Sequence, residues 1–395
     1  MDSRLRGNDP NRRFQLVPKF YLGTLLSAKL YFAFLFIPFT SFAQSNGNAD
    51  AWPLFRGDTQ MTGVAHSELP TELELLWTFQ TRDFLEGSPV ISNGLVYVAG
   101  LDSTLYAIDL ESGEKRWDYR LSDASKASPS VGFGMVFVGD ELGDFHAVDA
   151  KTGDKKWMFS TDGGIISGAN FYKDRVLFGS YDNFLYCMKA ETGELVWKFE
   201  TAGYVNGTPA IVGDKVIIGG CDALLRIFDI ETGKELVQTE AGGYVASTAA
   251  VKGERIFFGN FENQVVCFDV ATGKPQWIYE HPKRKFPYYA SAAVTDEWVI
   301  IAGRDKMVHA LNPESGEEVW AHVDRARIDS SPVIVGNRVF YGAKTGKVIG
   351  LNLADGEVVW EYETGAAIVT SPAVASDKLV IGNDDGVVFC FGAPR

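Results

Sequence analysis

Short apolar runs of four to six residues, separated by Gly, Asp or Asn turns, recur along most of the chain. One clear copy opens with Ser88-Pro89-Val90-Ile91, continues with residues 95–100 and 105–109, and ends with a run that contains Trp117. The runs are rich in β-branched and aromatic residues, which is typical of strands joined by hairpins. No stretch beyond residue 43 has the periodicity of a helix of useful length. The pattern predicts units of four antiparallel strands.

The turn before the fourth run has the common form Asp-x-x-(Ser/Thr)-Gly-x-x-x-Trp, although the third copy keeps only Thr192-Gly193 and Trp197, and Asn replaces Asp in the last two copies, the last of which has Asp355-Gly356. Successive tryptophans are 40 residues apart, except for one step of 80 across Val237 and one of 43. Four-stranded units that repeat about every 40–45 residues are blades of a β-propeller. The repeated residues are Trp77, Trp117, Trp157, Trp197, Trp277, Trp320 and Trp360, with Gly113, Gly153, Gly193, Gly233, Gly273, Gly316 and Gly356.

Each repeated residue type has a physical reason to recur. An Asp or Asn side chain can bond the backbone two residues on, and glycine takes the left-handed position that closes the turn. We expect the tryptophan, on the outermost strand, to cover the seam between neighbouring blades. A proline heads the first strand in five units, which suits the innermost strand because that strand is an edge facing the central channel. These prolines are Pro89, Pro129, Pro209, Pro332 and Pro372.

Counting the first strands gives eight blades, and the last unit ends after three strands without the Thr-Gly turn or the tryptophan. A spare fourth strand, residues 74–80, stands before the first blade and contains Trp77. We therefore predict an all-β fold: an eight-bladed β-propeller of four-stranded antiparallel blades. Strand 74–80 completes the last blade, so that both termini close the ring and no sheet edge stays open there.

Residues 1–43 have the features of a cleavable signal peptide. Six basic and two acidic residues accompany an apolar stretch, residues 30–39, which leads to the small-x-small site Ser41-Phe42-Ala43. The stretch is too short to span a bilayer, and no cysteine follows it to carry a lipid. We expect a periplasmic or secreted protein in which residues 44–73 pack on a single propeller formed by residues 74–395.

The charge balance excludes some classes of partner. The chain carries a net charge of −14, and removal of the basic leader leaves the mature protein near −18. Nucleic acids and anionic membrane surfaces prefer a basic face, so neither is an expected partner. With 46% hydrophobic residues, the chain can bury a large core. We expect a monomer with no direct membrane insertion.

The sequence contains no recognisable catalytic, cofactor-binding or metal-binding motif. Its five histidines lack HxxxH or HExxH spacing, and residues 342–347 only imitate a phosphate loop because no helix follows. Cys187, Cys267 and Cys390 occupy one position of the third strand in blades that are not neighbours, and Cys221 lies in a turn. We interpret them as buried small side chains rather than a disulfide framework.

Taken together, Ser-Pro-x-Val, Val-Tyr-Val-x-Gly and Leu-Tyr-Ala-Ile-Asp-x-x-(Ser/Thr)-Gly-x-x-x-Trp resemble the repeat of the pyrroloquinoline-quinone (PQQ) β-propeller family. The resemblance extends over about residues 74–392. The repeat occurs in quinoprotein dehydrogenases and in BamB, the propeller of the outer-membrane β-barrel assembly machinery. The size, the single uninterrupted ring and the export signal are similar to BamB, whereas the absence of a lipid-attachment cysteine departs from BamB lipoproteins.

The resemblance to BamB implies an exported, non-catalytic scaffold that makes protein–protein contacts, with a role in outer-membrane protein assembly. Exposed aromatics on propeller loops are candidate anchors for a partner. The loops entering the innermost strands and the turns between second and third strands should share one face. There we expect a basic sector of Lys283, Arg284, Lys285, Arg325 and Arg327. The candidate contact residues on these loops are Tyr181, Tyr204, Tyr244, Phe261, Tyr288, Tyr289 and Arg304.

Two alternatives remain open. One is a PQQ-dependent quinoprotein dehydrogenase; in such alcohol dehydrogenases the family resemblance implies an adjacent Cys-Cys pair, a calcium ion and a catalytic Asp on long insertions. This chain has no adjacent cysteines and short connections, so no site is transferred and no cofactor is expected. The other alternative is a propeller that senses a small ligand in its axial channel.

Overall fold

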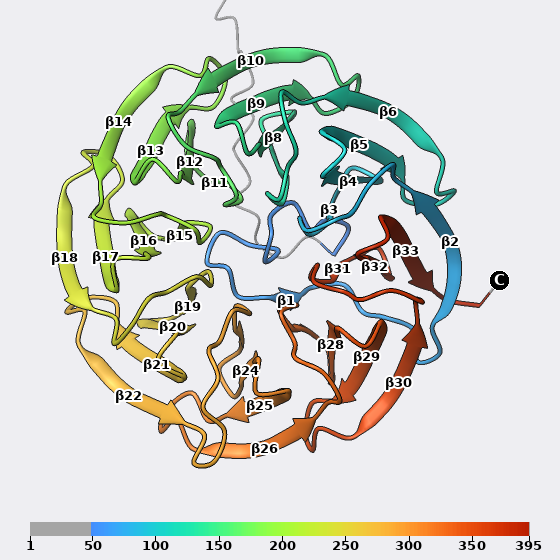
Figure 1. Ribbon diagram of the computed structural model, residues 1–395, viewed down its shortest axis with the longest axis vertical. Coiled ribbons are helices and arrows are strands. Elements are labelled where there is room, and N and C mark those ends of the chain that lie inside the picture. The colour runs from blue at the N-terminus through green and yellow to red at the C-terminus, as the bar shows by residue number, and fades with distance from the viewer. Residues whose placement is uncertain (1–48, 395) are drawn as a thin grey trace, which may run out of the picture. The chain divides into compact units, whose positions relative to one another are not determined.

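The computed structural model describes residues 49–394. The predicted signal peptide, residues 1–43, lies outside these residues. Within them the secondary structure consists of strands without a helix, and no helix there could cross a membrane. The strands form eight sheets arranged around a common centre (Figure 1), in agreement with the predicted eight-bladed propeller.

Each blade contains four antiparallel strands, which follow one another from the centre of the ring outwards. The innermost strands of blades 1 to 8 are β3 (Val90–Ser92), β7 (Ser130–Gly132), β11 (Asn170–Tyr172), β15 (Ala210–Val212), β19 (Ala250–Lys252), β23 (Ala293–Val294), β27 (Val333–Val335) and β31 (Ala373–Ala375). The second strands are β4 (Leu95–Gly100), β8 (Met135–Gly139), β12 (Arg175–Gly179), β16 (Lys215–Gly219), β20 (Arg255–Gly259), β24 (Val299–Ala302), β28 (Arg338–Gly342) and β32 (Lys378–Gly382).

The third strands are β5 (Thr104–Asp109), β9 (Asp144–Asp149), β13 (Phe184–Lys189), β17 (Leu224–Asp229), β21 (Gln264–Asp269), β25 (Met307–Leu311), β29 (Lys347–Asn352) and β33 (Val387–Gly392). The outermost strands are β6 (Lys115–Arg120), β10 (Lys155–Ser160), β14 (Leu195–Glu200), β18 (Glu235–Glu240), β22 (Pro275–Glu280), β26 (Glu318–Val323), β30 (Val358–Glu363) and β2 (Glu74–Gln80).

The position of a strand in its blade explains its residue pattern. Second and third strands pack against neighbouring blades on both faces, so they are almost wholly buried and read as continuous apolar runs. Outermost strands such as β14 and β30 show half-buried and exposed residues in alternation beyond their first two positions. The core therefore lies between the blades.

The repeated tryptophan of one blade packs on the Ser/Thr-Gly turn of the next. Trp157 Nε1 donates to the carbonyl of Ala190, 2.9 Å away, and a Cβ on Gly193 would meet the Trp157 ring at 2.7 Å. Five other seams repeat this pair of contacts. Blade 4 has Val237 in place of tryptophan, and Val237 packs against Gly273 instead.

Strand β2 closes the ring. It pairs antiparallel with β33, with Trp77 opposite Cys390 and Thr78 opposite Phe389. The Trp77 indole then donates to the carbonyl of Leu110 in blade 1, 2.9 Å away. The last blade is thus assembled from both ends of the propeller sequence, as predicted (Figure 1).

Residues 49–65, which we call the axial segment, occupy the centre of the ring (blue in Figure 1). The segment ends in β1 (Val64–Ala65), which adds a parallel fifth strand beside β27. Its side chains Trp52, Leu54 and Met61 are buried. Carbonyl groups of the segment accept backbone N–H groups from innermost strands around the ring, at 2.7–3.0 Å: Trp52 from Ile91, Pro53 from Val131, Thr59 from Ile211, Gln60 from Val251, Thr62 from Val294 and Gly63 from Ile334.

A second feature surrounds the centre, at the beginning of the innermost strands. Backbone N–H groups there donate to the hydroxyl of the following blade at 2.8–3.1 Å. Blade 3 has Gly168 at this position and contributes no hydroxyl. We call the seven residues the hydroxyl ring: Ser88, Ser128, Thr208, Thr248, Ser291, Ser331 and Ser371.

Candidate functional site

Two sets of connections form one face of the propeller, which we call the loop face. The first set leads from an outermost strand to the next innermost strand, and the second joins the second and third strands. Backbone hydrogen bonds tie the two sets together: Tyr181 donates to Gly164 at 2.9 Å, and Phe261 donates to Tyr244 at 2.9 Å. The candidate contact residues all lie on these connections.

In blades 3 and 4, Tyr181 and Tyr204 form an aromatic pair on the loop face. Their rings are stacked, with centroids 4.5 Å apart and an interplanar angle of 8°. Burial raises the pKa of Tyr181 to about 12, whereas Tyr204 is 48% exposed. Tyr204 therefore presents an apolar surface held in place by its neighbour.

In blades 5 and 6, the loops bring together Phe261, Tyr289 and Arg304. The rings of Phe261 and Tyr289 are 4.7 Å apart, and the Arg304 guanidinium lies 3.3 Å from the Tyr289 centroid. Arg304 also pairs with Asp329 at 2.7 Å. Tyr244 is 57% exposed, and its carbonyl accepts the backbone N–H of Phe261 at 2.9 Å, so it lies beside this cluster.

Tyr288 does not belong to the exposed surface, contrary to the sequence-based expectation. Its side chain is 1% exposed, and Cβ atoms added to Gly259 and Gly303 would lie 2.3 Å and 2.9 Å from it. In blades 3 and 4 the corresponding glycine at the end of the second strand packs against an aliphatic residue instead, Val205 and Val245 respectively. Tyr288 is therefore a core residue in a position that other blades fill with aliphatic side chains.

Sequence reasoning missed three exposed apolar residues on the loop face, Phe84, Leu142 and Phe286, which are 50–61% exposed. Phe84 precedes Tyr204 by three repeats of 40 residues, so alignment of the repeats could have found it. Phe286 lies on the connection into blade 6, which is three residues longer than the others. We call the exposed and half-buried aromatics of blades 3 to 6 the aromatic arc: Tyr181, Tyr204, Tyr244, Phe261, Phe286 and Tyr289.

The expected basic sector beside the aromatic arc is partly neutralised. Lys285 pairs with Glu280 at 2.6 Å, and Arg327 shares Asp329 with Arg304. Arg284 donates to the carbonyl of Asp305 at 2.7 Å. Lys283 and Arg325 are exposed. The sector thus combines cations with local carboxylates.

Below the loop face, five blades contain a polar pair that the sequence did not reveal. A Tyr, His or Arg on the third strand bonds a carboxylate in the turn that precedes the strand. The spacing is four residues in four blades but six in blade 2, which obscured the repetition. The pairs are Tyr106–Asp102, His146–Asp140, Tyr186–Asp182, Arg226–Asp222 and His309–Asp305.

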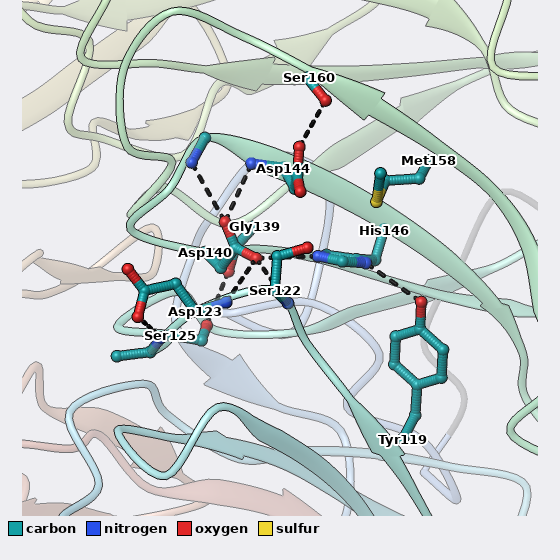
Figure 2. Close-up of polar contacts among 12 residues, drawn as sticks. Tyr119, Ser122, Asp123, Ser125, Gly139, Asp140, Asp144, His146, Met158 and Ser160 are labelled. Atoms are coloured by element: carbon teal, nitrogen blue, oxygen red, sulfur yellow. Dashed lines mark hydrogen bonds and ion pairs between the residues drawn. The ribbon is translucent and has the colours of Figure 1, made fainter.

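The pair in blade 2 lies in a cluster of three buried residues, Asp140, Asp144 and His146, whose ligand atoms are within 4.8 Å of one another (Figure 2). Asp140 accepts five N–H groups at 2.9–3.2 Å: the backbones of Ser122, Asp123, Gly143 and Asp144, and His146 Nε2. These bonds use the acceptor capacity of the carboxylate. The cluster therefore stabilises the loop that carries Asp140. Asp140 has no lone pair left to bind a cation.

In blade 6, His309 is buried between two carboxylates. Its Nε2 lies 2.8 Å from Asp305 and its Nδ1 lies 2.8 Å from Glu318. Burial alone would lower the pKa of His309, but the bonds to both carboxylates outweigh it and raise the pKa. Tyr279, Tyr288 and His281 are its other titratable neighbours.

This geometry predicts a pH-dependent contribution to stability. Because the folded-state pKa of His309 is raised, its stabilising effect is fully present below the unfolded value of about 6.5. The effect is lost as pH rises through the folded pKa. We expect the stability difference between the wild type and His309→Gln to shrink steadily above pH 6.5, measured by urea unfolding. Exposed His66→Gln is the control, and a pH-independent difference for His309→Gln would contradict the prediction.

The comparisons with known proteins agree with this architecture. The family described as "Outer membrane protein assembly factor BamB" matches residues 70–170, 161–285 and 262–392. No curated protein sequence matches the chain. Among solved structures, BamB from Moraxella catarrhalis is 20% identical with a TM-score of 0.70, and the match covers 82% of this chain and 100% of that one.

Enzymes with the same fold are also similar. Quinohemoprotein alcohol dehydrogenase from Comamonas testosteroni is 16% identical with a TM-score of 0.75, covering 89% of this chain and 82% of that one. Quinohemoprotein alcohol dehydrogenase ADHIIG from Pseudomonas putida is 15% identical with a TM-score of 0.74, covering 88% and 82%. At these identities the structural likenesses establish the fold and do not distinguish scaffold from enzyme.

Proposed function

Since the chain belongs to the family described as outer membrane protein assembly factor BamB, we propose that it is a non-catalytic scaffold of the cell envelope. Its aromatic arc binds a protein that takes part in outer-membrane protein assembly. The observation that carries this proposal is the cluster of partly exposed aromatic rings, fixed by stacking and backbone bonds, on a single face of the propeller.

The arc has the physical properties of a contact surface. Tyr204, Tyr244 and Phe286 are each about half exposed, and stacking or a guanidinium contact holds several of their neighbours in place. Rigid aromatics lose little conformational entropy on binding and often dominate the energy of protein interfaces. Arg304, which packs on Tyr289 and keeps a carboxylate partner, adds a charge that can orient the partner.

The competing hypothesis is a quinone-dependent dehydrogenase, the class to which two of the three structural matches described above belong. Two features favour the scaffold. The four cysteines include no adjacent pair and belong to different blades, and the axial segment is bonded to innermost strands around the ring. Incubating the protein with PQQ and calcium distinguishes the hypotheses, because a bound chromophore would support the enzyme and overturn the scaffold.

The scaffold proposal predicts that the double variant Tyr204→Ala/Tyr244→Ala loses partner binding. A central aromatic contributes about 2 kcal/mol or more to an interface, so losing both should reduce capture at least about tenfold. The measurement is crosslinking of the tagged, exported chain in native envelopes, followed by identification and quantification of the attached proteins. We expect the wild type to recover outer-membrane assembly components.

The matched control is Ile278→Ala/Val359→Ala, which removes apolar side chains of similar exposure, 55% and 51%, from the outermost strands β22 and β30. The control should capture as much partner as the wild type. Unchanged capture by the tyrosine variant would contradict the assignment of the aromatic arc. Failure of the wild type to recover any assembly component would contradict the proposed function itself.

A further inference from the structure

Arg56, at the centre of the ring, is a buried cation with unused hydrogen-bond donors. Its side chain is 0% exposed. Nη2 donates to the carbonyls of Ala292 at 3.2 Å and Pro332 at 2.5 Å. Among the residues that the structure describes, Nε and Nη1 have no partner. Because a guanidinium has five N–H donors, three of them are unsatisfied.

The fold also holds the guanidinium tightly in this place. The backbone N–H of Gly63 bonds the carbonyl of Arg56 at 3.0 Å, and a Cβ on Gly63 would fall 1.9 Å from Nη2. Asp58, the nearest carboxylate along the axial segment, is engaged by the backbone and hydroxyl of Thr62. Within residues 49–394, Arg56 therefore has no ion-pair partner.

The hydroxyl ring adds further donors around the same centre. Each of the seven hydroxyls accepts one backbone N–H, and in the described part of the chain none of their O–H groups donates to an acceptor. Ser291 and Ser331 directly precede Ala292 and Pro332, whose carbonyls hold the guanidinium. The guanidinium is thus held by the residues that directly follow two members of the hydroxyl ring, at the centre of an otherwise acidic protein.

A buried cation without a carboxylate in direct contact is costly, and unpaired buried donors add to the cost. Burial lowers the pKa of Arg56 to about 9, although the negative charge of Asp58 acts in the opposite direction, so the group is still a cation at neutral pH. We propose that a small inorganic anion of the size of chloride binds beside Arg56 Nε and Nη1, at the centre of the ring. The anion neutralises the guanidinium and fastens the axial segment to the innermost strands.

Crystals of the mature protein soaked in sodium bromide test the proposal directly. An anomalous bromide peak within hydrogen-bond distance of Arg56 Nε or Nη1 is the expected result. A map with bromide elsewhere on the molecule but none beside Arg56 would overturn the proposal. This experiment uses the wild type, so it tests anion binding even if variants of Arg56 fail to fold.

A solution experiment measures the linkage between anion and fold. At constant ionic strength, with the bulky anion gluconate replacing chloride, the folded-to-unfolded ratio should rise about tenfold per tenfold chloride once chloride exceeds its Kd. Arg56→Met should abolish this dependence. Arg338→Met is the control, because Arg338 binds the carbonyls of Leu69 and Pro70 outside the axial segment. Chloride dependence that survives in Arg56→Met, or is absent from the wild type, would overturn the proposal.

Discussion

Replacing Gly193 by alanine is expected to destabilise the propeller by about 2–5 kcal/mol, although only one methyl group is added. Gly193 has a φ of +70°, a conformation that costs an L-residue about 1–2 kcal/mol. The new Cβ would also fall 2.7 Å from the Trp157 ring. Displacing a well-packed aromatic from a seam adds about 1–3 kcal/mol.

The structure offers a close control for this experiment. Gly253 also has a positive φ, +59°, but no heavy atom lies within 4 Å of the place that a Cβ would take there. Gly253→Ala should therefore cost only the backbone penalty, about 1–2 kcal/mol. Unfolding of both variants in guanidinium chloride measures the difference between their losses of unfolding free energy. Equal losses would show that contact with the tryptophan does not explain why glycine recurs in these turns.

These seams also explain why the fold could be predicted from the sequence. A turn that needs a left-handed residue and a ring that must cover that turn recur at constant spacing, so Gly153 and Trp157 identify a blade from sequence alone. Blade 4 shows the tolerance of the pattern, because Val237 fills the place of the ring against Gly273. The spare strand around Trp77 could be assigned to blade 8 because that unit lacked its own fourth strand.

The candidate site was only partly predictable. Loop positions follow from hairpin order, which placed Tyr204 and Tyr244 correctly on exposed connections. Burial within a connection depends on packing against the neighbouring turn, so Tyr288 looked equivalent to Tyr289 although it replaces a core aliphatic residue. Without aligning the repeats, nothing in the sequence distinguished Phe84 from ordinary loop residues.

The axial segment shows where sequence reasoning ends. Residues 49–65 contain no repeat, and their bonds reach strands that are up to several hundred residues away, as in the contact between Arg56 and Pro332. Local patterns contain no information on such pairings. Sequence analysis also did not identify the buried pairs Asp140–His146 and Asp305–His309. The turns before the third strands have two geometries, so the carboxylate stands six residues before the histidine in one pair and four in the other.

Removal of β2, the strand that closes the ring, is expected to have the second large effect on stability. A chain that begins at Thr81 lacks β2, so it exposes the edge of β33 and leaves the seam with blade 1 without Trp77. Exposed strand edges promote aggregation, and loss of a buried tryptophan alone costs about 3–5 kcal/mol. We expect this truncated chain to aggregate or to unfold at much lower denaturant concentration than the mature protein.

The matched variant starts at Thr81 as well but carries residues 74–80 after Gly392, joined by Asn-Gly. Glu74 and Gly392 are direct partners in the antiparallel register, which suits a two-residue hairpin turn. Both variants lack residues 49–73, so only the strand differs between them. We expect the permuted chain to recover solubility and at least about 3 kcal/mol relative to the truncated one. Equal behaviour of the two would mean that pairing of β2 with β33 does not hold the ring closed, and Trp77→Ala in the intact chain would then cost much less than about 3 kcal/mol.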